Sequence, residues 1–268
     1  MLVIIVICVV FYAVLCALFS VFQHKLLFKQ TRFPSNHRFH YEFPFEELNW
    51  KTMDGNKING LWFKQQNPRG VILFFHGNSG HMGRSGNYFG HVKEHGYDVV
   101  MYDYRGYGKS TGFISRRNLY SDGLMVAEWV KAQYPGVPIV YHGLSLGSHV
   151  AAYVATKVSP ALLILETPFC DLTKLAQRKY FFMPVRLLSR FNLCTSCFLS
   201  RISAPIHVFH GTNDKVVPLS EAQLVAELSG AEITVVVGGT HKNLREFMAY
   251  SKTLKQLLDK VVNKHASI

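Results

Sequence analysis

The chain has 268 residues, with 29 basic side chains, 17 acidic side chains and five cysteines. Because 49% of the residues are hydrophobic and 17% are charged, the composition excludes an intrinsically disordered chain. Five cysteines in a chain of this length also exclude a small disulfide-stapled protein. The net charge of +12 favours an anionic partner. A membrane surface is preferred over nucleic acid, because no recognised nucleic-acid-binding motif is present.

A single hydrophobic span opens the chain, since residues 1–22 carry no charged side chain. As a helix, Leu2 to Phe22 would be about 31 Å long, which is enough to cross the hydrocarbon core of a bilayer. A cleaved signal peptide fits less well, because a basic n-region and a small-residue cleavage site are missing. We therefore expect a retained transmembrane anchor over residues 1–22 and a juxtamembrane linker over residues 23–40.

Basic side chains follow this span directly and indicate its orientation. They are Lys25, Lys29, Arg32 and Arg38. The positive-inside rule then predicts a single-pass membrane protein whose C-terminal body faces the cytoplasm.

The body, residues 41–265, predicts an α/β fold with a mostly parallel central sheet. Two strand-like runs, 48–53 and 57–63, flank Asp54-Gly55, which is a strong hairpin signal. Short continuous apolar runs then alternate with helical patterns, as is typical of parallel strands buried on both faces. The expected strands are 71–75, 98–102, 139–141, 161–165, 206–209 and 233–237. The expected helices are 121–134, 148–157, 220–228 and 243–262.

One segment interrupts the alternation of strands and helices. Residues 170–203 separate two expected strands and contain six basic side chains, five aromatic side chains and a single acid, Asp171. We interpret this segment as a small helical cap over the C-terminal edge of the sheet, where open α/β folds bind ligands. Its basic and aromatic side chains favour contact with anionic lipid headgroups or with a phosphate-bearing substrate.

The motif Gly143-Leu144-Ser145-Leu146-Gly147 matches G-x-S-x-G and lies between an expected strand and an expected helix. This context predicts a nucleophile elbow, a sharp turn that presents the Ser145 hydroxyl at the sheet edge. The flanking glycines leave room for the neighbouring strand and helix. The helix N-terminus favours negative charge that develops at Ser145.

A serine nucleophile needs a histidine base that a carboxylate orients. In this kind of fold the chain order is serine, acid and then histidine. Asp214 and His241 follow the last two expected strands and should lie on the same sheet edge as Ser145. We therefore expect Ser145, Asp214 and His241 to be the catalytic residues, with Asp171 as the alternative acid.

An oxyanion intermediate needs two backbone donors. The residue after the nucleophile, Leu146, supplies the first N–H group. The second should come from the glycine-flanked loop after strand 71–75, where we choose Asn78, with Ser79 as the alternative.

Together these motifs resemble the α/β-hydrolase family of serine hydrolases. The matching segments are H-G-N at 76–78, D-Y-R-G-Y-G-K-S at 103–110, the elbow at 143–147, H-G with D-K-V-V-P at 210–218, and the glycine before His241. With the N-terminal anchor, they resemble its membrane-anchored branch, which includes lysophospholipase-like and depalmitoylating thioesterase-like members. This resemblance covers about residues 40–262 and implies the α/β-hydrolase fold and hydrolase chemistry.

Three other patterns are interpreted without a functional role. The H-x-x-E-H pattern at 91–95 lacks a further zinc ligand, and G-Y-G-K-S at 106–110 lacks the first glycine of a P-loop. Cys194 and Cys197 do not follow a strand as redox pairs do, and a stable disulfide is not expected in a body that faces the cytoplasm. We expect no metal and no cofactor.

The sequence therefore predicts a membrane-anchored serine hydrolase that cleaves carboxylic ester or thioester bonds through an acyl-enzyme. Its expected partners are the lipid bilayer and a small-molecule or acylated substrate, without nucleic acid. Two alternatives remain open. One is a serine peptidase on the same fold, and the other is a catalytically silent binding protein.

Overall fold

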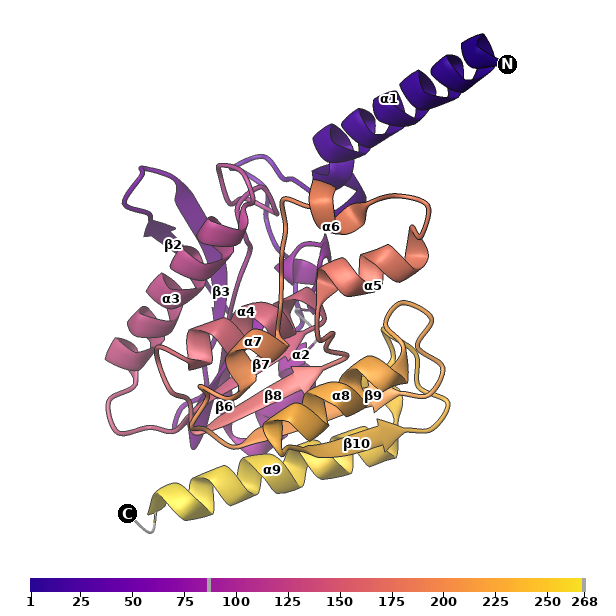
Figure 1. The fold of residues 1–268 in the computed structure, drawn as a ribbon. Coiled ribbons are helices and arrows are strands. Elements are labelled where there is room, and N and C mark those ends of the chain that lie inside the picture. The colour runs from indigo at the N-terminus through magenta and orange to yellow at the C-terminus, as the bar shows by residue number, and fades with distance from the viewer. Residues whose placement is uncertain (86–87, 267–268) are drawn as a thin grey trace.

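The computed structural model describes residues 1–85 and 88–266 (Figure 1). The strands of the main sheet are β2 (Glu46–Lys51), β3 (Lys57–Phe63), β4 (Gly70–Phe75), β6 (Tyr97–Tyr102), β7 (Ile139–Leu144), β8 (Leu162–Glu166), β9 (Ile206–Gly211) and β10 (Glu232–Val236). Two short strands that pair with each other are β1 (Lys29–Gln30) and β5 (Ser79–Gly80).

The helices of the described residues fall into an N-terminal helix, helices that flank the sheet, and three in the cap segment. They are α1 (Leu2–Leu27), α2 (Tyr88–Val92), α3 (Arg116–Gln133), α4 (Leu146–Ala155), α5 (Leu172–Lys179), α6 (Val185–Leu188), α7 (Ser196–Leu199), α8 (Leu219–Ser229) and α9 (Met248–Ala266). Short 3-10 turns cover Met82–Ser85, Lys93–His95 and Leu244–Glu246.

The main sheet has the strand order β10-β9-β8-β7-β4-β6-β3-β2. All neighbours from β10 to β6 pair in parallel, whereas β3 pairs antiparallel with both β6 and β2. Every residue of β4 and of β6 is buried, which explains why β4 is continuously apolar and why β6 is apolar apart from Asp98, a carboxylate that accepts hydrogen bonds from Gln65 and Tyr134. The predicted α/β architecture with a mostly parallel sheet is confirmed.

Helices cover both faces of this sheet. Apolar residues of α3, α4 and α8, such as Val126, Val150 and Val225, belong to one core cluster with one face of the strands. Apolar residues of α2 and α9, such as Val92 and Leu258, belong to a second cluster on the other face. Because both faces are occupied, the loops at the C-terminal ends of the parallel strands are left to form a binding site.

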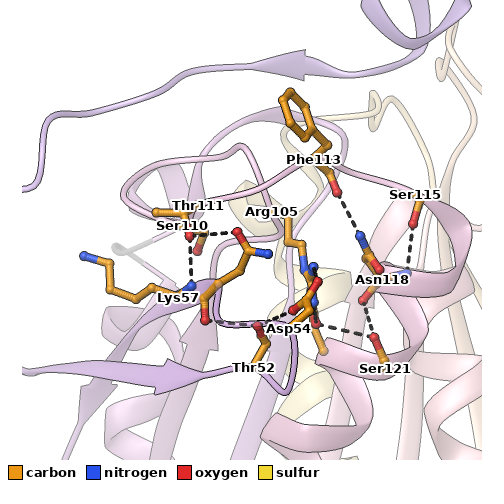
Figure 2. A network of polar contacts seen from close by, with 12 residues as sticks. Thr52, Asp54, Lys57, Arg105, Ser110, Thr111, Phe113, Ser115, Asn118 and Ser121 are labelled. Carbon is orange, nitrogen blue, oxygen red and sulfur yellow. Dashed lines mark hydrogen bonds and ion pairs between the residues drawn. The ribbon is translucent and has the colours of Figure 1, made fainter.

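A buried arginine fastens the loop after β6 to the sheet edge (Figure 2). Arg105 donates two hydrogen bonds to Asp122 of α3, at 2.8 and 2.9 Å, and one to Asp54 in the β2–β3 turn, at 2.5 Å. Arg105 and Asp122 are buried, whereas Asp54 is exposed. The hydrogen bond from Arg105 is the main reason why the pKa of Asp54 lies below its ordinary value. Hairpin, loop and helix are thereby joined at one residue.

Helix α1 projects away from the body (Figure 1) and continues past the apolar run to Leu27. Its segment Leu2–Lys25 is long and apolar enough to cross a membrane, by length and composition. Directly after α1, the strand β1 pairs in parallel with β5 in the loop that follows β4. The base of α1 is therefore held close to the C-terminal edge of the main sheet.

The last helix begins later than its sequence pattern predicts. We expected a helix from residue 243, but α9 begins at Met248. The reason is local, because Asn243 Oδ1 accepts hydrogen bonds from the N–H and the hydroxyl of Thr240, both at 2.7 Å. These bonds keep residues 240–243 in the loop that carries His241.

Candidate active site

Ser145 stands in a sharp turn between β7 and α4. Its φ of 53° lies in the left-handed region, which residues other than glycine rarely adopt. The turn is stabilised because the Ser145 N–H donates to the Glu166 carbonyl at 2.8 Å, and the Ser148 hydroxyl donates to the Gly143 carbonyl at 2.7 Å. Strained backbone that its surroundings hold in place is typical of functional sites.

The two glycines of the elbow are required by packing. A Cβ atom on Gly147 would lie 1.9 Å from the carbonyl oxygen of Phe75, and one on Gly143 would lie 2.4 Å from that of Gly147. No real Cβ atom approaches backbone that closely. The G-x-S-x-G pattern therefore fits the strand-to-helix turn that it predicts.

Asp214 and His241 are brought together from the loops after β9 and β10. Nδ1 of His241 donates to Oδ2 of Asp214 at 2.7 Å, and Oδ1 accepts from the N–H groups of Val216 and Val217 at 2.8 and 2.9 Å. Burial raises the pKa of Asp214, but these hydrogen bonds outweigh it, so the pKa lies below its ordinary value. An ionised carboxylate at Nδ1 leaves Nε2 of His241 as the proton acceptor, which suits a general base.

The alternative acid, Asp171, has other partners. It is the N-cap of α5, where Oδ1 accepts from the N–H groups of Thr173 and Lys174 at 2.8 and 3.1 Å. The structure therefore pairs His241 with Asp214 and uses Asp171 to begin the cap helix.

Ser145 and His241 follow β7 and β10, which run in the same direction in one sheet. Within the described residues, no hydrogen bond joins the Ser145 hydroxyl to the His241 ring. Catalytic hydrogen bonds of this kind often tighten only when substrate binds. The relation between these two residues remains a prediction from placement and chain order.

Ser145 lines an apolar cavity of about 80 Å³. Its apolar walls come from the base of α1, from α5 and from the loop after β9, and include Leu27, Phe28, Leu172, Leu175, Val216 and Val217. The loop that binds Asp214 through its N–H groups is thus also a wall of the Ser145 cavity. The sequence does not indicate that Leu27 and Phe28 line this cavity, because they follow the charged Lys25 in the segment that we predicted to be a juxtamembrane linker.

The two predicted oxyanion donors, Leu146 and Asn78, line the same cavity as Ser145. Leu146 is the first residue of α4, so its N–H has no acceptor within the helix. Asn78 is held by its side chain, which donates to the Leu27 carbonyl at 2.8 Å, and by its carbonyl, which accepts from the Tyr107 hydroxyl at 2.9 Å. Both positions suit the oxyanion role that we expect for them.

A buried polar cluster behind the elbow is missed by sequence reasoning. The Glu166 carboxylate contacts His142 Nε2 at 2.9 Å, the Tyr250 hydroxyl at 2.8 Å and Arg245 Nη2 at 3.2 Å. Burial raises the pKa of Glu166, but Arg245 and His142 outweigh it and lower the pKa to about 2. The same residue accepts the Ser145 N–H through its carbonyl, so the cluster supports the turn. Its members are too far apart in the chain to form a motif.

Cys194 and Cys197 form a disulfide, which corrects our expectation that no stable disulfide forms between them. Their Cα atoms lie 5.4 Å apart, within the normal range for a disulfide, because the chain turns into α7 between them. A C-x-x-C pattern outside a strand-to-helix context does not reveal this turn.

Comparison with known sequences gives matches over most of the body. A family model described as serine aminopeptidase, S33, matches residues 66–193. The uncharacterized protein Rv2307c of Mycobacterium tuberculosis is 31% identical over 204 residues, which cover 74% of this chain and 72% of that protein. Lysophosphatidylserine lipase ABHD12 of Danio rerio is 29% identical over 224 residues, which cover 72% of this chain and 58% of the lipase.

A further relative and two solved structures are also similar to this chain. Alpha/beta hydrolase domain-containing protein 17C of Xenopus tropicalis is 29% identical over 223 residues, covering 80% of this chain and 69% of that protein. The Pyrococcus furiosus esterase Pf2001 has a TM-score of 0.68 at 18% identity, covering 89% of this chain and 98% of the esterase. A carboxyl esterase from Bacillus coagulans has a TM-score of 0.65 at 16% identity, covering 81% of this chain and 99% of that esterase. At these identities the structures show likeness of fold.

Proposed function

Because this chain belongs to the α/β-hydrolase family and is an ester-bond hydrolase, we propose that it is a membrane-anchored serine hydrolase of acyl or lipid-like substrates. Its nucleophile is Ser145, its base is His241 and its acid is Asp214. The observation that carries the proposal is the 2.7 Å hydrogen bond from His241 to the buried Asp214, on the sheet edge that also presents Ser145.

In the proposed mechanism, Nε2 of His241 takes the proton from the Ser145 hydroxyl as the oxygen attacks the acyl carbonyl. The Asp214 carboxylate stabilises the imidazolium that forms. The N–H groups of Leu146 and Asn78 stabilise the tetrahedral oxyanion. His241 then protonates the leaving alcohol or thiol, and the acyl group stays on Ser145. A water molecule, activated by His241, releases the acid and restores the serine.

The walls of the Ser145 cavity support an acyl substrate. They are mainly Leu, Phe and Val side chains, which favour a hydrocarbon chain over a charged group. Relatives include a lysophosphatidylserine lipase, although this chain spans only 58% of its length. We therefore propose carboxylic esters or thioesters of long acyl chains as substrates.

The match to a serine aminopeptidase model raises the alternative of peptide hydrolysis. An aminopeptidase must hold a free α-ammonium group, for which a carboxylate is the usual partner. Among the described residues that line the Ser145 cavity, none is Asp or Glu. The lining therefore favours acyl hydrolysis.

The same proposal places α1 across a bilayer with the body on its cytoplasmic side. Exposed basic side chains of the cap would then contact anionic headgroups near the membrane surface. They include Lys174, Arg178, Lys179, Arg186 and Arg190.

The test is hydrolysis of a palmitoyl lysophospholipid and a palmitoylated peptide by the full chain in lipid nanodiscs. We expect the wild type to cleave an acyl lipid or an acylated peptide. Asp214→Asn should lower kcat by about 10⁴-fold, because the histidine loses its orienting carboxylate. Asp171→Asn, which keeps a capping side chain, is the matched control and should stay within about two-fold. Activity restricted to short water-soluble esters would contradict the proposal.

A further inference from the structure

A second apolar cavity, of about 40 Å³, lies between α1 and the cap. Helices α1 and α5 each contribute to its lining three side chains at intervals of four residues, which form a stripe along one face of the helix. The stripes are Phe19, Gln23 and Leu27 on α1, and Leu172, Ala176 and Tyr180 at α5 and its C-cap. The membrane-anchor helix and the cap helix therefore face each other across this cavity.

This cavity adjoins the one that contains Ser145. Leu27 and Leu172 line both cavities, one from α1 and one from α5. From Leu27 to Phe19 the route follows α1 for about 12 Å, at 1.5 Å per residue. It leads from Ser145 toward the segment of α1 that is apolar enough to cross a membrane.

The polar side chains in this wall are bonded to other protein groups. Gln23 is buried, donates to the Leu188 carbonyl at 2.9 Å and accepts from the Arg190 N–H at 2.7 Å. The Thr173 hydroxyl donates to the Asn192 amide oxygen at 3.3 Å. Because these groups are satisfied, the cavity presents mainly apolar atoms to an occupant. Gln23 also fixes α1 to the cap.

The far end of the route lies beside the apolar part of α1. The Tyr12 hydroxyl donates to the Phe182 carbonyl at 2.9 Å, and the Phe19 ring packs against Tyr180 with centroids 6.0 Å apart. Both contacts fall within the candidate span Leu2–Lys25. The nearby cap residues with large exposed apolar side chains are Phe181, Phe182 and Leu187, at 80%, 57% and 83% exposure. Lipid tails around α1 would cover these side chains.

We propose that α1 forms one wall of the acyl-binding site and that the acyl chain of a bilayer lipid enters between α1 and α5 to reach Ser145. This inference rests on the proposed function. The Phe19–Tyr180 pair lies at the bilayer end of the route, and the Leu27–Leu172 pair lies at the Ser145 end. Since the two cavities measure only about 40 and 80 Å³, the side chains along the route move apart as the chain enters.

The experiment compares two alkyl fluorophosphonates, one with an ethyl chain and one with a dodecyl chain, on the full chain in nanodiscs. Both probes react with an activated serine in the same way, and their partition into the nanodisc is the same for every variant. A change in the ratio of their labelling rates between variants therefore reports on the acyl route. Ala176→Trp fills the route from α5, and Ala176→Leu fills it partly. Leu18→Trp is the control, because Leu18 is a neighbour of Phe19 on α1 but is 48% exposed.

We expect the dodecyl-to-ethyl ratio to fall at least about tenfold in Ala176→Trp and less in Ala176→Leu, and to stay within about two-fold in Leu18→Trp. Wild-type ratios in both Ala176 variants would overturn the inference while leaving the hydrolase intact. If Ala176→Trp loses reaction with both probes, Ala176→Leu decides the question. Failure of the wild type to react with either probe would overturn the proposed function itself. The dodecyl rate should follow the mole fraction of probe in the bilayer; dependence on its aqueous concentration would contradict entry from the membrane.

Discussion

At Gly147 the nucleophile elbow has no space for a methyl group, because the carbonyl oxygen of Phe75 would lie 1.9 Å from it. We expect Gly147→Ala to lower the free energy of unfolding by about 1–3 kcal/mol through overpacking and to reduce activity. Denaturant unfolding in detergent measures this loss. Gly77→Ala is the comparison, since its nearest contact would be an ordinary 3.6 Å. Equal losses for the two variants would show that the tight approach has no energetic effect.

Buried histidines make the body sensitive to acid. Burial lowers the pKa of His76 and of His149 to about 3, so both stay neutral in the folded protein. In the unfolded chain they take up protons near their ordinary pKa of about 6.5. Between these two values the unfolded state binds more protons, so stability falls as the pH falls.

His149→Gln should therefore reduce the dependence of stability on pH between pH 6 and pH 4, by about 1.4 kcal/mol per pH unit. The measurement is the free energy of unfolding at several pH values. An unchanged slope in His149→Gln would show that this histidine is protonated in the folded state.

Among single residues, those with a local signal could be predicted from the sequence. The elbow around Ser145 and the pairing of Asp214 with His241 follow from strand ends and chain order, and the structure contains both the turn and the hydrogen bond. The Gln23 contact with the cap spans 165 residues and leaves no pattern in the chain. The Cys194–Cys197 disulfide depends on a turn that the residue spacing does not specify.

At the level of elements, Arg105 joins the β2–β3 hairpin, the loop after β6 and helix α3 (Figure 2). Arg105→Ala would leave Asp122 buried without its cation, and loss of such a partner costs about 3–5 kcal/mol. Burial already raises the pKa of Asp122 in the presence of Arg105. The free energy of unfolding should drop accordingly.

The double variant with Arg105→Ala and Asp122→Asn provides the control for this prediction. Removing the buried charge should recover part of the lost stability, because the remaining penalty is then that of a neutral amide. A double variant that is less stable than Arg105→Ala alone would contradict the explanation. In that case the hydrogen bonds that the Asp122 carboxylate accepts, such as the one from the Ser121 hydroxyl, and not its unpaired charge, would be the important property.

The strands were the easiest elements to predict. Runs such as β4 are buried on both faces, so their apolar residues are continuous and easily recognised. Helix ends were harder, because side-chain hydrogen bonds, local at α9 and tertiary at α1, decide them. Asn243 bonds to Thr240 and delays α9, and the base of α1 is drawn onto the cap. Neither effect changes the local hydrophobic pattern.

For the whole molecule, the orientation across the membrane gives a prediction about thiols. If the body faces the cytoplasm, as residues 25–38 predict, the disulfide that the structure forms between Cys194 and Cys197 should be reduced to two thiols in intact cells. A thiol-reactive polyethylene glycol should then modify both cysteines after selective permeabilisation of the plasma membrane, without added reductant. The matched control replaces Cys194 and Cys197 by serine and reports labelling of the other cysteines. Protection of the pair until reductant is added would contradict the cytoplasmic orientation and favour an oxidising compartment.

The central claim is that Ser145 is an activated nucleophile in a membrane-anchored body. Its most direct test is labelling with a fluorescent fluorophosphonate in membrane fractions, with wild type beside Ser145→Ala and His241→Ala at equal expression. We predict strong labelling of the wild type alone, because the serine needs both its own hydroxyl and the histidine base. No labelling of folded wild type, or undiminished labelling of Ser145→Ala, would contradict the claim.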